Sequence, residues 1–340
     1  MDEVRASEPA LPLPDFAALD FDRLWQGRSK TTRVEAEVLT EALARTDPAR
    51  VLEVGAGGGR LTPWVRRRAS EFVALDLTRA FVERLDPHWA SPPLGFRAAA
   101  NVYRLPFVRG AFSTVAMVRV YNFLRDPLAS LREIRRVLRP GGHLAFSYDP
   151  KPSLGTLASD VRAALEPRSG PIRLETFSPE DLVPVRPSSF PAWAPTRERV
   201  RRTLEVSGFA LEREFGTGLE DFRPFKWLPS SVFPGISRAF GEGANGLFPT
   251  RFVVARSRGD PEPGSRLPPL PATIACPRCG AEPGPFDLRI DWVRRCPSCG
   301  FELRYRDGLL EAIAPGEGAR ATRDAEAPSA AVRADANSAR

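Results

Sequence analysis

The feature of this sequence that most constrains its fold is a short apolar run that leads into a glycine-rich turn. Residues 51–54 read Val-Leu-Glu-Val, and residues 55–60 read Gly-Ala-Gly-Gly-Gly-Arg. An apolar run before such a turn predicts a buried strand, and a helix is expected after it. Because glycine has no side chain, the backbone of the turn can lie close to a flat polar ligand. The segment therefore predicts an α/β fold with a ligand at its first turn.

Two phosphate-binding patterns that use glycine turns do not fit these residues. A P-loop ends in Gly-Lys-Ser/Thr, which does not follow here, and the dinucleotide pattern needs glycine at the position of Arg60. Instead, Asp76 ends the next apolar run, residues 72–75. An acidic residue at the tip of a second strand is placed to accept hydrogen bonds from both hydroxyls of a ribose. The ligand expected at this turn therefore contains a ribose.

Three further motifs follow in order. They are Leu-Pro-Phe at 105–107, Phe-Ser-Thr-Val at 112–115 and Arg-Val-Leu-Arg-Pro-Gly-Gly at 136–142. Together with the glycine turn they resemble class I S-adenosylmethionine-dependent methyltransferases, in particular the branch called methyltransferase type 11. The resemblance implies a Rossmann-like, seven-stranded, mostly parallel sheet with helices on both faces. The alternative is an α/β domain that shares only the fold.

Two positions depart from the pattern of that family. Asn101 stands where the family usually has an acidic residue that reaches the adenine amino group, although an amide oxygen can accept the same hydrogen bond. Ser113 replaces an aspartate at the start of the fourth strand. We expect ligand binding to survive both changes, and affinity and catalysis are the properties that they would affect.

The resemblance implies a donor that lies across the carboxyl ends of strands one, two and four. The glycines would hold the methionine and ribose portion, and Asp76 would hold the ribose. The adenine would lie between Leu77 and Val102, with Asn101 at its edge. The implied donor-binding residues are Glu53, Gly55, Gly57, Gly59, Asp76, Leu77, Asn101 and Val102.

The acceptor side is less defined by the sequence. Methyl transfer from a sulfonium is an in-line displacement, so alignment does most of the work and a base is needed only where the acceptor must lose a proton. Neither His88, in a turn, nor His143, at the far start of a strand, is well placed as a base. Trp25 and Arg28 either fold over the donor or only pack. The acceptor-side candidates at strand ends are Arg119, Tyr121, Asn122, Tyr148 and Asp149, each alternatively a packed or solvated loop residue.

All four cysteines form two Cys-x-x-Cys pairs near the carboxyl end. The pairs are Cys276 with Cys279 and Cys296 with Cys299. This spacing is typical of a zinc ribbon, and four thiolates leave no open coordination position, so a Zn²⁺ ion here would be structural. Disulfides or a redox pair are the alternatives.

Residues 272–313 also resemble the small zinc-ribbon activators that partner tRNA, rRNA and release-factor methyltransferases. The likeness lies in Ile-Ala-Cys-Pro at 274–277 and Tyr-x-Asp-Gly-Leu-Leu at 305–310. In those relatives the ribbon lends a strand and shields apolar surface on the enzyme. A possible protein partner and a purely stabilising appendage both remain open. We expect the ribbon and the methyltransferase domain to behave as independent modules.

Periodicity and composition divide the chain into segments. Helices are expected at 33–45, 128–138 and around 200–204, and strands at 115–120, 143–148, 209–215 and 251–255. The expected organisation is an N-terminal, partly disordered segment 1–32, a methyltransferase domain 33–257 with an insertion 150–196 as acceptor lid, a linker 258–271, the zinc ribbon 272–313 and a disordered tail 314–340.

Charge and hydropathy restrict the partners. The net charge is +7, yet the sequence has no block of five or more like charges and no interleaving of basic with aromatic residues that would predict a nucleic-acid surface. No long apolar run predicts membrane insertion, and the amino terminus does not resemble a secretory signal, so we expect a cytoplasmic protein. The leading hypothesis is a methyltransferase for a small or medium organic acceptor. The alternatives are a tRNA, rRNA or protein substrate, and a non-catalytic donor-binding scaffold that docks on a partner methyltransferase.

Overall fold

The computed structural model describes residues 25–85, 94–151, 153, 182–185, 190–222, 225–240, 248–259 and 266–313. The first part of the N-terminal segment, His88, most of the expected lid, part of the expected linker and the tail 314–340 lie outside the described residues.

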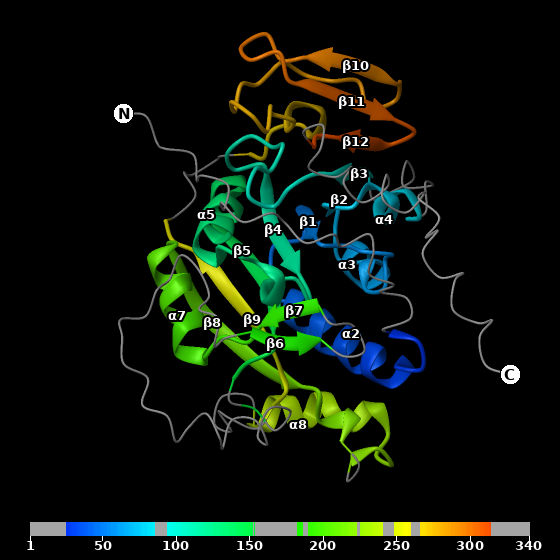
Figure 1. Ribbon diagram of the computed structural model, residues 1–340, viewed down its shortest axis with the longest axis vertical. Helices are drawn as coiled ribbons and strands as arrows, with labels where there is room; N and C mark the ends of the chain where they lie inside the picture. The colour runs from blue at the N-terminus through cyan, green and yellow to red at the C-terminus, as the bar shows by residue number, and fades with distance from the viewer. Residues whose placement is uncertain are drawn as a thin grey trace, which may run out of the picture.

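The central sheet has the strand order β3-β2-β1-β4-β5-β9-β8 (Figure 1). β3, β2, β1, β4 and β5 pair in parallel, and β9 pairs antiparallel with both β5 and β8. This arrangement confirms the mostly parallel sheet expected from the sequence. The strands are β1 Arg50–Val54, β2 Glu71–Asp76, β3 Leu94–Ala99, β4 Phe112–Met117, β5 Leu138–Tyr148, β8 Phe209–Thr217 and β9 Thr250–Ser257.

Helices cover both faces of this sheet, as expected. On one face, α2, α3 and α4 pack against the sheet through an apolar core that includes Leu39, Val65 and Val82. The other core joins it to α5 and α7, through Leu131 and Leu204. The helices are α2 Ser29–Leu43, α3 Thr62–Arg66, α4 Arg79–Glu83, α5 Pro127–Val137, α7 Arg197–Val206 and α8 Phe233–Phe240.

Local sequence signals explain where α5 and α7 begin and end. The carboxylate of Asp126 accepts a hydrogen bond from the amide of Ala129 at 2.8 Å, and Pro127 follows as the first helical residue. Thr196 caps α7 in the same way. Gly208 follows α7 with a φ of +85°, a backbone conformation that favours glycine.

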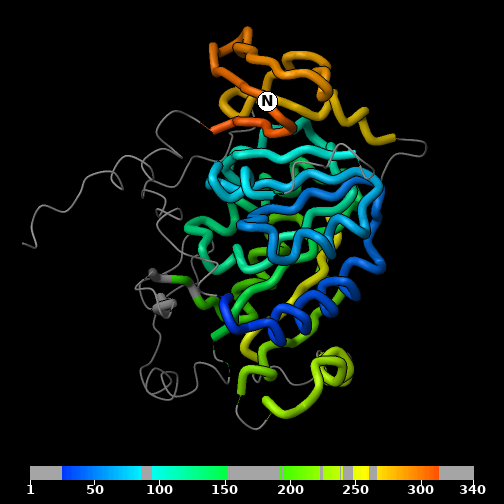
Figure 2. Tube along the Cα trace, turned by 90° about the vertical axis from the view of Figure 1, so that its right-hand side faces the viewer, coloured from blue at the N-terminus to red at the C-terminus, as the bar shows by residue number. Residues whose placement is uncertain are grey.

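The carboxyl-terminal ribbon extends the central sheet. Its strands are β10 Trp292–Arg295, β11 Glu302–Arg306 and β12 Leu309–Glu311, and β12 pairs in parallel with β3. The result is a ten-stranded sheet with the ribbon at one end, as both views show (Figure 1 and Figure 2).

The ribbon also shares the core of the methyltransferase domain. Tyr305 packs edge-on against Phe96 of β3, with ring centroids 6.2 Å apart. The Leu-Pro-Phe segment contacts the start of the ribbon, because the amide of Ala275 donates to the carbonyl of Pro106 at 3.0 Å and Phe107 forms a bridge with Ile274. This continuity differs from the independent modules expected from the sequence.

Part of the insertion forms a hairpin outside the main sheet. β6, Leu182–Val185, pairs antiparallel with β7, Phe190–Trp193. β7 contacts the short helix η2, Tyr121–Phe123, which follows β4. The hairpin therefore lies near the carboxyl ends of β4 and β5. Among the described residues, no helix combines the length and apolar character needed to span a membrane.

Candidate donor and acceptor site

The glycine turn lies at the carboxyl end of β1 and adopts backbone conformations that favour glycine. Gly55 and Gly57 have φ values of +74° and +55°. A Cβ atom on Gly55 would lie only 2.1 Å from Cγ2 of Val120, whereas a Cβ atom on Gly57 would meet no atom within 4 Å. The turn is therefore packed tightly against the end of β4 on one side and open on the other.

Asp76, at the carboxyl end of β2, faces this turn. Its Oδ2 accepts a hydrogen bond from the amide of Gly57 at 2.9 Å, and its Oδ1 accepts one from the amide of Thr78 at 2.9 Å. Burial raises the pKa of this carboxyl, while those backbone hydrogen bonds act to lower it. Each carboxylate oxygen has two acceptor sites, so both oxygens keep capacity for a further donor. The carboxylate is thus fixed in orientation beside the open glycine.

Glu53, within β1, supplies a second buried carboxyl. Its Oε2 has no hydrogen-bond partner in the part of the chain that the structure describes. Burial, reinforced by the charge of Asp76, raises the pKa of Glu53 to about 8. A bound cation would favour the ionised form of this carboxyl.

Asn101, which follows β3, is buried, whereas Leu77, which follows β2, and Val102 are partly exposed. Its Oδ1 accepts a hydrogen bond from the amide of Tyr103 at 3.0 Å, and its Nδ2 has no partner among the described residues. The amide oxygen that was expected to meet the adenine amino group is thus already engaged by the backbone. The group that remains for a ligand is the amide nitrogen, which is a donor.

Three of the five acceptor-side candidates form one network at the ends of β4 and β5. Nη1 of Arg119 donates to both carboxylate oxygens of Asp149, at 2.7 and 2.8 Å. Asn122 and Asp149 exchange two hydrogen bonds, of 3.0 and 2.9 Å, through the Asn122 side chain and the Asp149 backbone. Thr250 of β9 donates to Oδ1 of Asp149 at 2.7 Å. Arg119 has a φ of +60°, which is rare for a residue other than glycine.

Glu35 of α2 completes this network and was not anticipated from the sequence. Its fully buried carboxylate contacts the guanidinium groups of Arg119 and Arg60, the latter at 2.7 Å. Burial alone would raise the pKa of Glu35, but Arg119 and Arg60 hold it below its ordinary value. The ring of Trp25 packs against the guanidinium of Arg60, whose central carbon lies 3.6 Å from the ring centroid. In the sequence, Glu35 was indistinguishable from the other charged residues of a surface helix.

Tyr121 and Tyr148 lie on the other face of the sheet from this network. Their rings are fully buried beside Phe146, with the two tyrosine centroids 6.0 Å apart. Burial raises the pKa of both phenols, so they stay protonated at neutral pH. These two candidates therefore belong to the core on the side of α5 and α7.

Two further residues lie at the opposite, amino-terminal edge of the sheet. Ser113 is buried, and its hydroxyl joins the backbone of Arg50 by hydrogen bonds of 2.8 and 2.9 Å. The position that lacks the family's aspartate thus has a structural role away from the ligand edge. His143 lies within β5, where it pairs with Thr114 near the start of β4, and its Nε2 lies 3.5 Å from Oε2 of Glu212.

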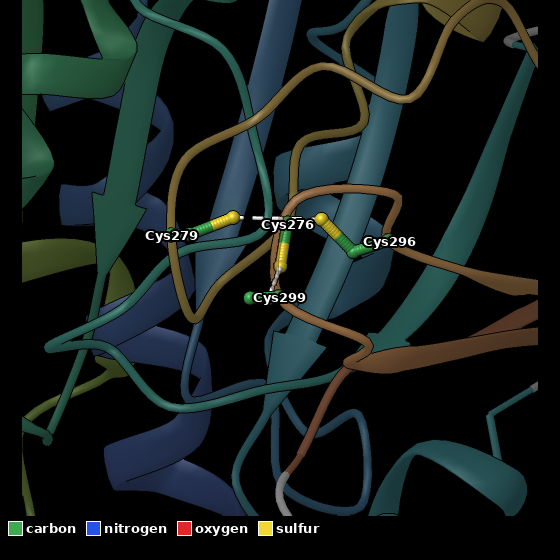
Figure 3. Close-up of side chains that lie close together, drawn as sticks. All are labelled: Cys276, Cys279, Cys296 and Cys299. Atoms are coloured by element: carbon green, nitrogen blue, oxygen red, sulfur yellow. Dashed lines mark hydrogen bonds between the residues drawn. The ribbon is translucent and has the colours of Figure 1, made fainter.

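The four cysteines converge within the ribbon, with their sulfur atoms directed toward one another (Figure 3). All four Sγ atoms lie within 4.8 Å of one another, and the Cys276–Cys299 and Cys279–Cys296 pairs are 3.6 and 3.4 Å apart. A tetrahedral zinc site with Zn–S bonds of about 2.3 Å requires sulfurs roughly 3.8 Å apart. The cluster therefore has the size and ligand set of a four-thiolate site.

Comparison with known proteins agrees with this geometry. Residues 52–146 match the family model described as a methyltransferase domain. The chain is 30% identical over 211 residues to a ubiquinone biosynthesis O-methyltransferase of Xanthomonas oryzae pv. oryzae, covering 59% of this chain and 84% of that protein. It is 26% identical over 248 residues to a malonyl-[acyl-carrier protein] O-methyltransferase of Geobacter sulfurreducens, covering 71% of this chain and 86% of that protein.

Among solved structures, the chain is similar to a possible histamine N-methyltransferase of Thermotoga maritima. The identity is 16%, the TM-score is 0.48, and the match covers 70% of this chain and 95% of that one. The sequence relationship to the Xanthomonas protein extends over most of that enzyme's length. Together with the matched domain, it shows that this chain belongs to the S-adenosylmethionine-dependent methyltransferases.

Proposed function

We propose that this enzyme transfers a methyl group from S-adenosylmethionine to an oxygen atom of a small or medium organic acceptor. The observation that carries the proposal is the relationship to two curated enzymes that are both named as O-methyltransferases. One is named for ubiquinone biosynthesis and the other for malonyl-[acyl-carrier protein]. No continuous basic surface was expected from the charge pattern, which favours a small acceptor over RNA.

The donor would bind at the carboxyl ends of β1 and β2. The open side of Gly57 leaves room for the ligand, and the oriented carboxylate of Asp76 would accept hydrogen bonds from the ribose hydroxyls. The unpartnered Oε2 of Glu53 would face a cationic group of the donor, which compensates the cost of ionising a buried carboxyl. Leu77 and Val102 would contact the adenine, and Nδ2 of Asn101 would donate to one of its ring nitrogens.

The ribbon would hold one Zn²⁺ ion through Cys276, Cys279, Cys296 and Cys299. The four sulfurs already lie at separations close to those of a tetrahedral site. The backbone supports this geometry, because Gly280 and Gly300 donate to the carbonyls of Cys276 and Cys296 at 2.8 and 2.9 Å. With four thiolate ligands the ion would have no position for water, and its role would be structural.

Donor binding is tested by calorimetry with S-adenosylhomocysteine on the wild type and on Asp76→Ala. We expect the variant to lose at least about tenfold in affinity, because it removes a charged acceptor of ligand hydrogen bonds. Glu83→Gln, at an exposed position of α4, is the matched control and should bind as the wild type does. Equal affinity of all three proteins would contradict the proposed donor site.

The acceptor class is tested with methyl-labelled donor and fractionated cell extract. Label in small metabolites supports the proposal, and label in RNA or protein would replace it with one of the alternative substrates. Tight donor binding without transfer to any fraction would favour the scaffold alternative.

A further inference from the structure

A carboxylate that the sequence patterns did not single out lies at the ligand edge of the sheet. Glu220 belongs to the short helix η4, Leu219–Asp221, which follows β8. Because β9 is antiparallel to both β5 and β8, the carboxyl ends of β5 and β8 lie at the same edge. Thr217, at the end of β8, pairs with Thr250, and Thr250 in turn donates to Asp149 at 2.7 Å. Glu220 thus follows the strand end next to the Arg119 network.

The carboxylate of Glu220 is buried, and only one of its oxygens is satisfied. The residue is 2% exposed. Its Oε2 accepts a hydrogen bond from the amide of Gly218 at 2.9 Å, while its Oε1 has no partner among the described residues. A buried acceptor without a donor destabilises a protein. Such an atom is expected where a ligand supplies the missing hydrogen.

Charged groups from three elements surround this carboxylate. Asp221 lies on the same short helix, and its Oδ1 accepts a hydrogen bond from Thr31 of α2 at 2.7 Å. Glu35 of α2 and Arg119, which follows β4, both interact electrostatically with Glu220. Burial, reinforced by the charges of Asp221 and Glu35 and opposed by backbone hydrogen bonds, raises the pKa of Glu220 to about 7. A carboxyl that titrates near neutral pH is suited to general base catalysis.

We propose that Glu220 is the general base that removes the proton from a hydroxyl group of the acceptor. This inference rests on the proposed O-methyltransferase function. The acceptor oxygen forms a bond to the methyl carbon, and the carbon–sulfur bond breaks with its electron pair staying on sulfur. The hydroxyl proton passes to Oε1 of Glu220 and then to water.

The proposal also defines the class of acceptor as an alcohol or a phenol. A phenolic hydroxyl has a pKa of about 10, so it needs a base at neutral pH. An acceptor carboxylate is already ionised at that pH and needs none. A buried base beside the donor would therefore have no task with a carboxylate acceptor.

Other described groups are less suited to this task. His143 lies at the amino-terminal edge of the sheet, beside Glu212. Asp149 is held by Arg119 and Thr250, which engage its carboxylate oxygens. Tyr121 and Tyr148 are buried on the other face. Of the carboxylates that interact with Arg119, only Glu220 combines a raised pKa with an unpartnered oxygen in the described chain. Glu53 shares both properties, but it lies within β1 and is assigned to the donor.

The first test compares wild type, Glu220→Gln and the control Glu212→Gln. Glu212 belongs to β8, the strand that leads to Glu220, but it lies toward the opposite edge of the sheet. The acceptor probes are catechol and protocatechuate, and the latter offers both ring hydroxyls and a carboxylate. We expect a ring ether as the product, and we expect the kcat of Glu220→Gln to be at least about 100-fold below that of the wild type. The wild-type rate should rise with pH through about 7, and Glu220→Gln should lack this rise. Donor affinity measured by calorimetry should be the same in all three proteins.

The second test follows the carboxyl group itself and needs no turnover. Difference infrared spectroscopy between wild type and Glu220→Gln, both with S-adenosylhomocysteine bound, should show a carboxyl that loses its proton near pH 7. A carboxyl that is already ionised at pH 5 would overturn the assignment.

The outcomes separate the two proposals. A methyl ester of protocatechuate would keep the O-methyltransferase function and overturn the base. A ring ether formed by Glu220→Gln as fast as by the wild type would also support the O-methyltransferase function and overturn the role of Glu220 as a base. Absence of transfer to either oxygen, together with no label in any small metabolite of the extract, would overturn the function and the base with it.

Discussion

At the scale of single residues, the site depends on how this fold handles buried carboxyl groups. Glu35 and Glu53 are both buried on the donor side of the sheet, yet their environments differ. Glu35 contacts two guanidinium groups and stays ionised, whereas burial raises the pKa of Glu53 to about 8. The first carboxyl binds neighbouring elements together, and the second is available for a cationic ligand.

Replacing Glu35 by glutamine should destabilise the protein. The change leaves the guanidinium groups of Arg60 and Arg119 without their buried counter-charge, which costs about 3–5 kcal/mol. Urea unfolding at neutral pH measures the loss. Glu41→Gln is the matched control on the same helix, because Glu41 lies 3.7 Å from Arg213 at the surface and should change stability little. Equal stability of the two variants would show that the network is not essential for folding.

The Glu53→Gln variant should change the pH dependence of stability. The folded state raises the pKa of Glu53 from about 4.5 to about 8, so folding favours its protonated form. The stabilisation that Glu53 contributes to the folded state is fully present below its unfolded pKa, and it is lost as the pH rises toward 8. Each unit of that shift corresponds to about 1.4 kcal/mol. The variant should therefore gain stability relative to wild type between pH 6 and pH 9 in urea unfolding. A constant difference across this range would mean that the carboxyl is already ionised.

At the scale of elements, the contact between β3 and β12 links the cysteine cluster to the proposed donor site. The amide of Arg97 donates to the carbonyl of Gly308 at 2.8 Å, and the amide of Ala312 donates to the carbonyl of Ala99 at 2.9 Å. Ala99 ends the strand that leads to Asn101. The ribbon thus closes an edge of the sheet that would otherwise expose unpaired backbone groups beside the proposed adenine position.

Removal of the proposed Zn²⁺ ion should loosen this edge. We expect one zinc ion per chain by native mass spectrometry, and we expect chelation or Cys296→Ser to unfold the ribbon. The amides of Arg97 and Ala312 should then lose protection in hydrogen exchange, because both of their acceptors lie across the shared edge. Glu302→Gln, on the exposed surface of β11, should retain full protection. Unchanged protection of β3 in the metal-free protein would restore the interpretation of two independent modules.

At the scale of the whole molecule, periodicity was sufficient to predict most of the central sheet. Apolar runs indicated β1, β2, β4 and β5, because parallel strands buried on both faces are apolar along their length. The bounds differ for two of them: the strand expected at 115–120 is β4 at Phe112–Met117, and the one expected at 143–148 is only the second half of β5. The expected helix at 33–45 corresponds to α2, which begins four residues earlier at Ser29, where no side chain caps it. The two Cys-x-x-Cys pairs also predicted the convergence of the four sulfurs that the structure shows.

The sequence by itself thus determined the class of fold and the placement of Gly55, Gly57 and Asp76, because these depend on local patterns along the chain. The sequence also predicted Arg119 at a strand end, but only the tertiary structure placed Glu35 and Glu220 near it at one edge of the sheet, and only it joined the ribbon to β3. Those contacts join residues that are far apart in the sequence, and no periodic signal marks a charged residue that will become buried. The physical reason is that burial of charge is decided by which elements pack together, and that depends on the whole chain.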